Sequence, residues 1–408
     1  MKNLFHKKMT RNDYQRMKTL GSITIVSLCF ILSMGNLNRN DLNEIAIVYS
    51  LGIDWEDDQY KVSMQVINPP NLHNPSDKLP VIVYEEKSKS FGKAIEMVSK
   101  KIPRELNLSQ VQLIIVGKTL AEKKGIDKVL NYVLREPGLS SMMDILISEN
   151  ITAYDALQVI SVMEDIPSSE IVKTLKNTEE NWGSHQQVLP TKLKGNILSK
   201  EMESIVPTII LKGNNKDSQE KTIQEQPTSK AFLELSGLTV FKGDKIVGKL
   251  DDNQSRSYYL VKGSLKNSYF SAPCSKNTDE EYGLNIIKSK TTIHGEVKNN
   301  KPNFKINTEV VGDLDELNCA MDLTTPNGIK KIEASMEKEI VLAIEDLINQ
   351  SKQLNSDIIG FGEVLRIEDN ENWKKIKSKW KDDIYATSNI EIKVKTIIRN
   401  FGDTNLTK

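Results

Sequence analysis

A basic arm followed by an apolar run opens this 408-residue chain and constrains where everything after it can fold. The arm carries six lysine and arginine residues within its first 18 positions, and the apolar run extends over Leu20–Gly35. A cationic flank stays in the cytoplasm while the apolar residues behind it enter the bilayer. We therefore expect the residues after Gly35 to fold and act outside the membrane.

The apolar run is short for a membrane-spanning helix. It has roughly 15 apolar residues, whereas a spanning helix needs about 20. Ser33 and Gly35 provide small residues at the −3 and −1 positions of a signal-peptidase site. The segment 1–35 is therefore predicted to be a basic arm with a signal peptide that is cleaved before Asn36, and an uncleaved anchor is the alternative.

Length and net charge narrow the possible functions of the exported part. A chain of 408 residues is long enough for two or three domains, each with its own core. Lysine and arginine number 55, as do aspartate and glutamate, so the formal net charge is +0. Nucleic-acid binding depends on a surplus of cations that displaces condensed counterions. We therefore predict no nucleic-acid partner.

Three cysteines are too few for a disulfide framework or a thiolate metal site. Cys29 lies within the apolar run, which leaves Cys274 and Cys319 in the exported part. Two free thiols are the favoured interpretation. A single bridge between these two residues is the alternative, because disulfides form outside the cytoplasm.

Residues 36–212 alternate between strand-like and helix-like patterns, which predicts an N-terminal α/β domain with a mixed sheet. Ile45–Ile53 and Tyr60–Ile67 are strand-like and flank an acidic turn, so they predict a hairpin. Val111–Gly117 is a continuous apolar run too short for a helix. Such a run predicts a central strand that is covered on both faces.

Two polar stretches interrupt these patterns. Thr152 is a candidate cap for a helix that is expected to reach Ile160. After it, Asn177–Gln187 and Gly213–Lys230 carry little apolar periodicity. The second stretch predicts a solvated linker or long loop, and we place a domain seam near it.

Residues 213–280 are predicted to form this linker and a small β-rich middle region. Ala231–Phe241 and Lys245–Leu250 are strand-like, and Gly243 between them suits a tight turn with a positive φ.

Residues 281–408 predict a C-terminal α+β domain. Thr292–Val297, Phe304–Val310 and Asn389–Arg399 have the alternation of strands. Pro326 opens a long helix whose apolar residues recur every three or four positions. We expect an antiparallel sheet with long helices on one face.

Candidate catalytic groups are few. The histidines are widely separated, and no sequence pattern places one beside a nucleophile and an orienting acid. Paired carboxylates that could hydrolyse a glycosidic bond occur at Asp57-Asp58, Asp251-Asp252 and Asp382-Asp383. Each pair falls in a predicted turn or helix end, where aspartate bonds nearby amides. We predict no catalytic residue, no metal site and no cofactor, so the residues alone indicate a binding or structural module.

A lysine-rich segment with two tryptophans, Trp373–Lys381, has two interpretations. Cations beside tryptophans are typical of helices that lie on anionic membranes. Helical spacing, however, places Trp373, Ile376 and Trp380 on one stripe and most of the lysines off it. A helix that faces the core with a solvated back is therefore favoured.

The Gly360-Phe361-Gly362 segment is not a nucleotide-binding loop, because it lacks the third glycine and the preceding strand of such loops. We expect both glycines to adopt backbone conformations that a β-carbon would strain, and Phe361 to pack inward.

Three stretches of the chain carry a resemblance to a known family. Leu42–Asp54 contains Leu-Asn, Ala-Ile-Val and Gly-Ile-Asp, Val240–Leu250 is followed by Ser-Arg, and 357–363 reads Asp-Ile-Ile-Gly-Phe-Gly-Glu. In these stretches the chain resembles the Ger(x)C (GerAC-like) family, the C subunits of spore nutrient germinant receptors. The motif positions expected to serve structure or partner contact are Leu42, Asn43, Gly52, Asp54, Phe241, Lys245, Gly248, Arg256, Gly360, Phe361, Gly362 and Glu363.

The resemblance implies a non-enzymatic subunit at the outer face of the spore inner membrane, needed for nutrient-triggered germination. Its implied partners are integral membrane subunits of the A and B types. Asn36 stands where the family has a lipid-bearing cysteine, so we predict no lipidation. The alternatives are an extracytoplasmic ligand-binding module of the lipoprotein kind and a cortex-directed hydrolase.

Overall fold

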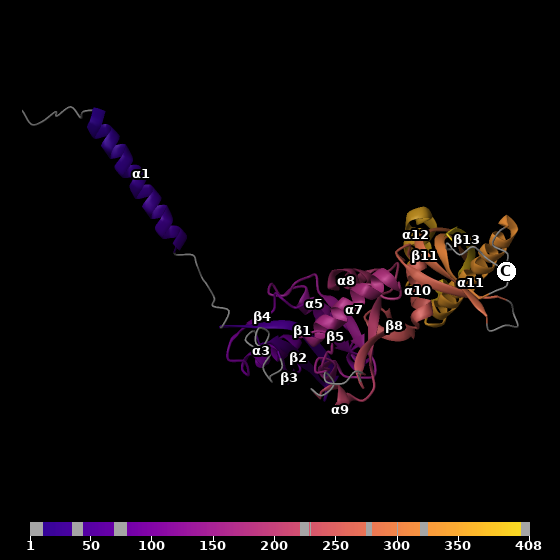
Figure 1. The fold of residues 1–408 in the computed structure, drawn as a ribbon, viewed down its shortest axis with the longest axis horizontal. Coiled ribbons are helices and arrows are strands. Elements are labelled where there is room, and N and C mark those ends of the chain that lie inside the picture. Colours follow the sequence, from indigo (N-terminus) through magenta and orange to yellow (C-terminus); the bar gives the residue numbers. More distant parts are fainter. Residues whose placement is uncertain are drawn as a thin grey trace, which may run out of the picture. The chain divides into compact units, whose positions relative to one another are not determined.

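The computed structural model describes residues 11–34, 44–68, 80–220, 228, 230–274, 280–299, 301–318 and 325–400 (Figure 1). The chain divides into two compact units, Met1–Ile45 and Ala46–Lys408. The first unit contains helix α1 (Arg11–Met34). Over the described residues, no helix combines the length and the apolar character needed to cross a membrane. The predicted cleavage site before Asn36 and the motif positions Leu42 and Asn43 fall outside the described residues.

Nine strands of the described chain form one mixed sheet in the order β3-β2-β1-β5-β6-β7-β8-β9, with β4 paired to β1. They are β1 (Ile45–Glu56), β2 (Gln59–Ile67), β3 (Val81–Ser88), β4 (Glu105–Asn107), β5 (Leu113–Gly117), β6 (Asp144–Ser148), β7 (Ile205–Lys212), β8 (Phe232–Lys242) and β9 (Lys245–Leu250). The central neighbours β1, β5, β6 and β7 are parallel, and the outer pairs are antiparallel. The predicted mixed N-terminal sheet is confirmed.

Two local predictions in this sheet are also confirmed. β1 and β2 pair as an antiparallel hairpin, and both residues of its turn, Asp57 and Asp58, have positive φ angles of 51° and 56°. Such angles are those of the tight turns that match the twist of a hairpin. Every residue of β5 is buried, and β5 lies between β1 and β6 as a central strand.

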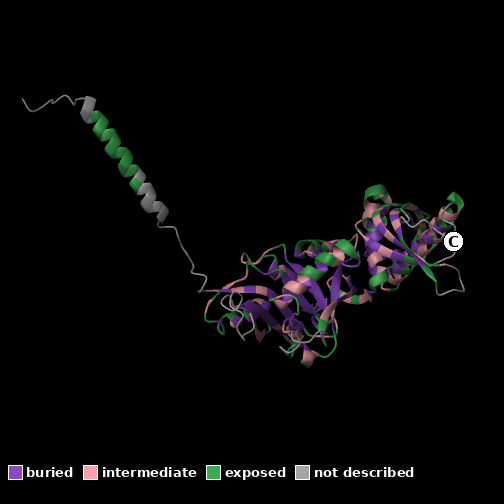
Figure 2. Ribbon diagram, in the orientation of Figure 1, coloured by how far each residue is buried: buried purple, intermediate pink, exposed green. Residues whose placement is uncertain are grey.

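Helices cover both faces of the first sheet because successive side chains of its central strands point to opposite sides. Ile114 and Val116 pack with α3 (Phe91–Ser99), α4 (Lys118–Lys123), α5 (Asp127–Val133) and α8 (Pro190–Leu198). Leu113 and Ile115 pack with α6 (Ala153–Ala156) and α7 (Pro167–Asn181). Figure 2 shows the resulting buried strands between helices.

The second sheet has the order β10-β11-β12-β13, formed by β10 (Ser268–Pro273), β11 (Glu281–Lys298), β12 (Lys301–Leu317) and β13 (Asn389–Asn400). Its core includes residues of α10 (Asp252–Val261), α11 (Pro326–Gln353), α12 (Phe361–Glu368) and α13 (Asn370–Ile376). A π-helical turn at Trp380–Ile384 and a 3-10 turn at Tyr385–Thr387 lead into β13. This arrangement confirms a C-terminal sheet combined with helices.

One detail of that sheet differs from the expectation. β13 pairs in parallel with β12, so the sheet is mixed and not wholly antiparallel. The reason lies in the connection between the two strands. The long helix α11 and the shorter helices after it return the chain to the end at which β12 began, and a strand that starts there runs in the same direction.

The strands between residues 213 and 280 are divided between the two sheets. β8 and β9 extend the first sheet, and β10 begins the second. Gly243 in the β8–β9 turn has a φ of 60°, as predicted. Apolar residues of β7, β8 and β9 also belong to the core that surrounds α10 and α11, namely Ile205, Leu238, Val240 and Leu250. The domain boundaries themselves stay a prediction.

Two local expectations are wrong, for the helix after Thr152 and for Cys274, and one polar stretch is partly helical. The helix capped by Thr152 ends at Ala156, because the amide of Ile160 bonds instead to the carbonyl of Ser218, 2.8 Å away. Part of the polar stretch from residue 177 onward is helical, since it forms the end of α7. Cys274 is disulfide-bonded, which contradicts the free-thiol interpretation for this residue.

Candidate functional site

The Gly-Ile-Asp motif at the end of β1 joins that strand to α6. The buried carboxylate of Asp54 accepts hydrogen bonds from the amides of Ala153 and Tyr154, each at 2.9 Å. Burial raises the pKa of Asp54, and these two hydrogen bonds oppose the rise. A β-carbon on Gly52 would lie 3.1 Å from the Ala153 backbone. The motif therefore uses a glycine for close approach and an acid that satisfies the amides at a helix start, which have no partner within the helix.

The second motif lies in the β8–β9 hairpin, which packs against the end of α11. The carbonyl of buried Phe241 accepts a hydrogen bond of 2.7 Å from the hydroxyl of Ser356. A β-carbon on Gly248 would lie 2.4 Å from the Leu354 side chain. Lys245 is exposed on the same hairpin, and no contact in the structure explains its identity.

The third motif is built around a buried aspartate, Asp357. Its carboxylate accepts hydrogen bonds from the amides of Gly360 (2.8 Å), Phe361 (3.0 Å) and Gly362 (2.9 Å), and from the Trp380 indole (2.9 Å). Burial raises the pKa of Asp357, and these hydrogen bonds act against that shift. The acid thereby satisfies the amides at the start of α12, which have no partner within the helix.

The two glycines of this motif are needed for different reasons. Gly360 has a φ of 87°, which a residue with a side chain adopts only with strain. Gly362 does not have a positive φ, so the expectation of strained torsion at both glycines is wrong for it. A β-carbon on Gly362 would lie 2.5 Å from the Glu201 carbonyl oxygen and 2.7 Å from the Trp380 indole nitrogen.

Phe361 is fully buried, as the sequence predicts, in a cluster of aromatic rings. Its ring centroid lies 4.5 Å from that of Phe304 and 6.2 Å from that of Tyr385. Trp373 and Trp380 are also buried and meet edge to face at 5.5 Å, which confirms that the tryptophans of the lysine-rich segment face the core. The expected single helix is wrong, because α13 ends at Ile376 and Trp380 lies in the π-helical turn. Glu363 is partly exposed and lies 3.8 Å from Arg366.

Glu203 connects the second and third motifs. Its amide donates a 2.8 Å hydrogen bond to the Asp357 carbonyl, and its carboxylate accepts one of 2.7 Å from the Gly243 amide. The other carboxylate oxygen lies 2.9 Å from the ammonium nitrogen of Lys381. Glu203 is buried and belongs to an irregular segment before β7, so no periodic pattern in the sequence could identify it.

Arg256 is the motif position that lies in α10, and its side chain connects this helix to β10 and to nearby aromatic rings. Its guanidinium donates to the Tyr269 carbonyl and to the Asn253 side chain. The same group lies over the rings of Trp182 and Phe270, at 5.2 and 5.3 Å from their centroids. A planar guanidinium suits this combination of stacking and hydrogen bonding better than an ammonium group.

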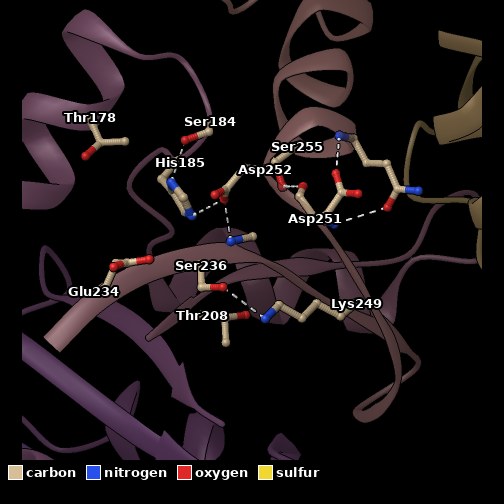
Figure 3. Close-up of polar contacts among 12 residues, drawn as sticks. Thr178, Ser184, His185, Thr208, Glu234, Ser236, Lys249, Asp251, Asp252 and Ser255 are labelled. Carbon is tan, nitrogen blue, oxygen red and sulfur yellow. Dashed lines mark hydrogen bonds and ion pairs between the residues drawn. The ribbon is translucent and has the colours of Figure 1, made fainter. Parts of the chain in front are cut away.

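A serine, a histidine and an acid meet near the start of α10 (Figure 3). The Ser184 hydroxyl lies 2.7 Å from Nδ1 of His185, and Nε2 lies 3.8 Å from Asp252. Burial lowers the pKa of His185 to about 4, although Asp252 opposes this shift. Ser184 is 0 % exposed and His185 2 % exposed. The serine and the histidine are therefore closed to solvent, whereas the Asp252 side chain is 50 % exposed.

This cluster was missed by sequence reasoning because Asp252 is remote in the chain from the adjacent pair Ser184-His185. Asp251, beside Asp252, caps α10 through a reciprocal pair of hydrogen bonds with Gln254, as expected of an acid at a helix end. In the described part of the chain, no three His, Cys, Asp or Glu side chains are arranged to hold a metal ion.

Two models of known protein families match this chain, and the matched residues include the three motifs. A family model described as "Spore germination protein N-terminal domain" matches residues 38–211, and one described as "Spore germination B3/ GerAC like, C-terminal" matches residues 236–402. The chain belongs to the GerAC-like family of spore germination proteins. The motifs that carry the resemblance thus lie in both domains of the family.

Curated relatives align with nearly the whole chain. Spore germination protein KC of Bacillus subtilis (strain 168) is 25 % identical, with 93 % of this chain and 95 % of that protein covered. Spore germination proteins B3 and A3 of the same organism are 21 % and 23 % identical, and each comparison covers 95 % of this chain and 99 % of the relative. The relatives are therefore similar across both domains.

A solved structure shares the fold. The crystal structure of the GerBC protein superposes with a TM-score of 0.52 at 18 % identity, covering 86 % of this chain and 97 % of that one. This likeness supports the combination of an N-terminal sheet with a C-terminal sheet and helices.

Proposed function

We propose that this chain is the non-enzymatic C subunit of a spore germinant receptor and acts at the outer face of the spore inner membrane in nutrient-triggered germination. The proposal rests on the match of both family domains to spore germination proteins. It is supported by near-complete coverage of the relatives KC, B3 and A3. Integral membrane subunits of the A and B types are the proposed partners.

The buried contacts of Asp357 and Glu203 indicate what such a subunit contributes. Asp357, Glu203 and Lys381 link α12 and the turn before β13 to the segment between α8 and β7. Buried contacts of this kind have discrete packed arrangements. A movement of one element is therefore passed to the elements that pack against it. We propose that the subunit passes on or stabilises the germinant-triggered change and does not bind the nutrient alone.

The geometry favours a non-enzymatic role over a cortex-directed hydrolase. The acidic pairs lie in a hairpin turn, at the start of α10 and in the π-helical turn, which are structural positions. The Ser184–His185–Asp252 cluster is closed to solvent on the serine and histidine side.

A ligand-binding module is the second candidate, because one pocket has the size of a small-molecule site. Its volume is about 300 Å³, and it is lined mainly by apolar side chains, with Glu170 as the acidic group. The lining residues are Val159, Ile160, Ser161, Val162, Met163, Pro167, Glu170, Ile171, Phe232 and Leu233. Saturable binding of a free nutrient by the purified full-length chain would support this candidate.

Gene deletion in spores that lack paralogous receptors tests the main proposal. We expect loss of the response to one nutrient, restoration by the intact gene, and recovery of two integral membrane proteins with this chain from dormant spore membranes. An unchanged response to every nutrient contradicts the proposal. Release of muropeptides from cortex peptidoglycan by the purified chain would instead support the hydrolase.

A further inference from the structure

A basic groove lies between the end of α8 and the pair α12–α13. It is open to solvent, has a volume of about 530 Å³, and its floor includes the buried ring of Trp373. The lining residues are Gly195, Leu198, Ser199, Lys200, Glu201, Arg366, Asn370, Trp373, Lys374 and Lys377. We call this feature the basic groove.

Cations outnumber acids in the basic groove. Four of its lining residues are lysine or arginine and one is an acid, Glu201. Arg366 lies 2.9 Å from Glu201, and Lys374 lies 3.2 Å from the exposed Glu371. Lys200 and Lys377 form none of the ion pairs found among the described residues. Because the whole chain has a formal charge of +0, this surplus is local and not a property of the overall composition.

Large aliphatic side chains stand exposed beside these cations. Leu198, the last residue of α8, lines the groove and is 69 % exposed. Ile367, which follows Arg366 in α12 but does not line the groove, is 66 % exposed. Exposed aliphatic residues next to lysines are typical of surfaces that lie in the headgroup region of a membrane.

The kind of cation decides between a lipid surface and an acidic protein segment. Protein interfaces depend on arginine forks and aromatic faces that fill pockets. Here the arginine is already engaged by Glu201, and Trp373 is 3 % exposed. The available charges are ammonium groups on flexible stems, which suit mobile phosphates without a fixed geometry.

We propose that the basic groove binds the anionic phospholipid headgroups of a membrane surface, with Leu198 entering the interfacial layer. This inference deepens the proposed location at a membrane and therefore rests on it. Lys374 and Lys377 lie in and directly after α13, and Lys200 follows α8. Trp373 in α13 and Trp380 in the π-helical turn are both buried, so the tryptophans are not the membrane anchors.

Vesicle flotation of the purified full-length chain tests the proposal. The measured quantity is the ratio of partition coefficients for vesicles of equimolar phosphatidylglycerol and phosphatidylcholine and for vesicles of phosphatidylcholine alone. The basic N-terminal arm also favours anionic vesicles, but it is the same in the natural chain and in every variant, so the change in this ratio between them reports the groove. Each lysine near an anionic surface contributes about 1 kcal/mol, so the triple variant Lys200→Gln, Lys374→Gln, Lys377→Gln is expected to lower the ratio on the order of 100-fold.

A matched control removes the same charge elsewhere. Lys330, Lys331 and Lys338 lie on α11, away from the groove lining, and their triple glutamine variant is expected to leave the ratio within about threefold of the natural chain. Leu198→Ser is expected to weaken binding to both kinds of vesicle, whereas Leu342→Ser, at a residue 47 % exposed on α11, is not.

Equal losses in the two triple variants, or no loss in either, overturn the inference. Unchanged vesicle binding of the groove variant together with loss of a co-purifying protein from spore membranes also overturns it and assigns the groove to an acidic protein segment. Failure here leaves the proposed function standing as long as gene deletion abolishes a nutrient response. Retention of all nutrient responses after deletion refutes the proposed function whatever the vesicles show.

Discussion

At the scale of single residues, Gly360 and Gly362 both disfavour a side chain, for different reasons. At Gly360 the reason is the backbone torsion, and at Gly362 it is the lack of space for a β-carbon. Gly360 has a φ of 87°, and a β-carbon there would meet nothing closer than 3.6 Å. We expect Gly360→Ala to cost about 1 kcal/mol of unfolding free energy. Gly362→Ala is expected to cost about 2–3 kcal/mol, because the Glu201 backbone 2.5 Å away cannot rotate aside.

Urea unfolding followed by tryptophan fluorescence measures both losses, with Gly195→Ala as the control. Gly195 lies in α8, and a β-carbon there would have nothing within 4 Å, so alanine is expected to be neutral or to stabilise by about 0.5–1 kcal/mol. A Gly362→Ala midpoint at or above that of Gly195→Ala would show that the crowding around α12 is relieved at no cost.

A second prediction at this scale concerns Asp144, the first residue of β6. Burial raises the pKa of Asp144 to about 6 from 3.8, although a hydrogen bond with Gln187 opposes the shift. The folded chain therefore holds this proton more tightly than the unfolded chain, and stability falls as pH rises from 3.8 to about 6. The shift corresponds to a loss on the order of 3 kcal/mol.

Asp144→Asn is expected to remove this loss, because an amide does not ionise. The variant and the natural chain should have similar unfolding free energies near pH 3.8, where Asp144 is protonated in the folded chain. At pH 7 the variant should be the more stable of the two. Chemical denaturation at a series of pH values gives the difference between them. A difference that does not change with pH would mean that burial of Asp144 is not what sets its pKa.

At the scale of elements, α12 depends on one buried acid at its start. Asp357→Ala would leave three amides and the Trp380 indole without their acceptor, and each unsatisfied buried donor costs about 1–3 kcal/mol. We expect a loss of about 4 kcal/mol or more, together with a weaker near-ultraviolet circular dichroism signal from the tryptophans.

Glu371→Ala is the matched control for Asp357→Ala. Glu371 is an acid in the neighbouring helix α13 whose side chain is 84 % exposed, and its removal is expected to change stability by less than about 0.5 kcal/mol. Equal effects of the two substitutions would contradict a special role for Asp357. Asp357→Asn, which keeps one acceptor oxygen in its amide group, should fall between them.

Elements with a strong pattern could be predicted from the sequence, and those without one could not. The continuous apolar run of β5 corresponds to a fully buried strand, and the two strand-like runs beside the acidic turn correspond to the β1–β2 hairpin. α7 escaped prediction because its apolar face is sparse: Ile171 and Leu175 are buried with a serine, and Val172 is partly buried beside them. The parallel direction of β13 depends on how far the preceding helices carry the chain, which no local pattern encodes.

The same limit applies to the candidate site. The motif glycines and acids could be named from the sequence, but their partners could not. Glu203 reaches Asp357 and Lys381 from an irregular segment. Asp252 meets His185 only because α10 begins beside the segment that follows α7. Contacts between residues so distant in the chain follow from packing and leave no periodic trace.

At the scale of the whole molecule, strand pairing crosses the polar stretch that suggested a domain seam. β7 ends at Lys212, before that stretch, and β8 begins at Phe232, after it, yet the two strands pair along their length. β8 in turn carries the hairpin whose Phe241 carbonyl is held by Ser356. A break in the chain between β7 and β8 would therefore leave the sheet continuous and the hydrogen bond between Ser356 and Phe241 in place.

The last prediction follows from this pairing. Within the second compact unit, Ala46–Lys408, trypsin is expected to cut first at residues 213–230, because this stretch is polar and contains Lys216, Lys221 and Lys230. The two fragments should elute together in gel filtration under native conditions, since β7–β8 pairing and the buried contacts of Glu203 hold them, and should separate in guanidinium chloride. Replacing the three lysines with glutamine should slow the cut without changing the folded chain. Fragments that separate under native conditions would show that the two sheets are independent domains joined by a linker, as the composition of the stretch alone suggests.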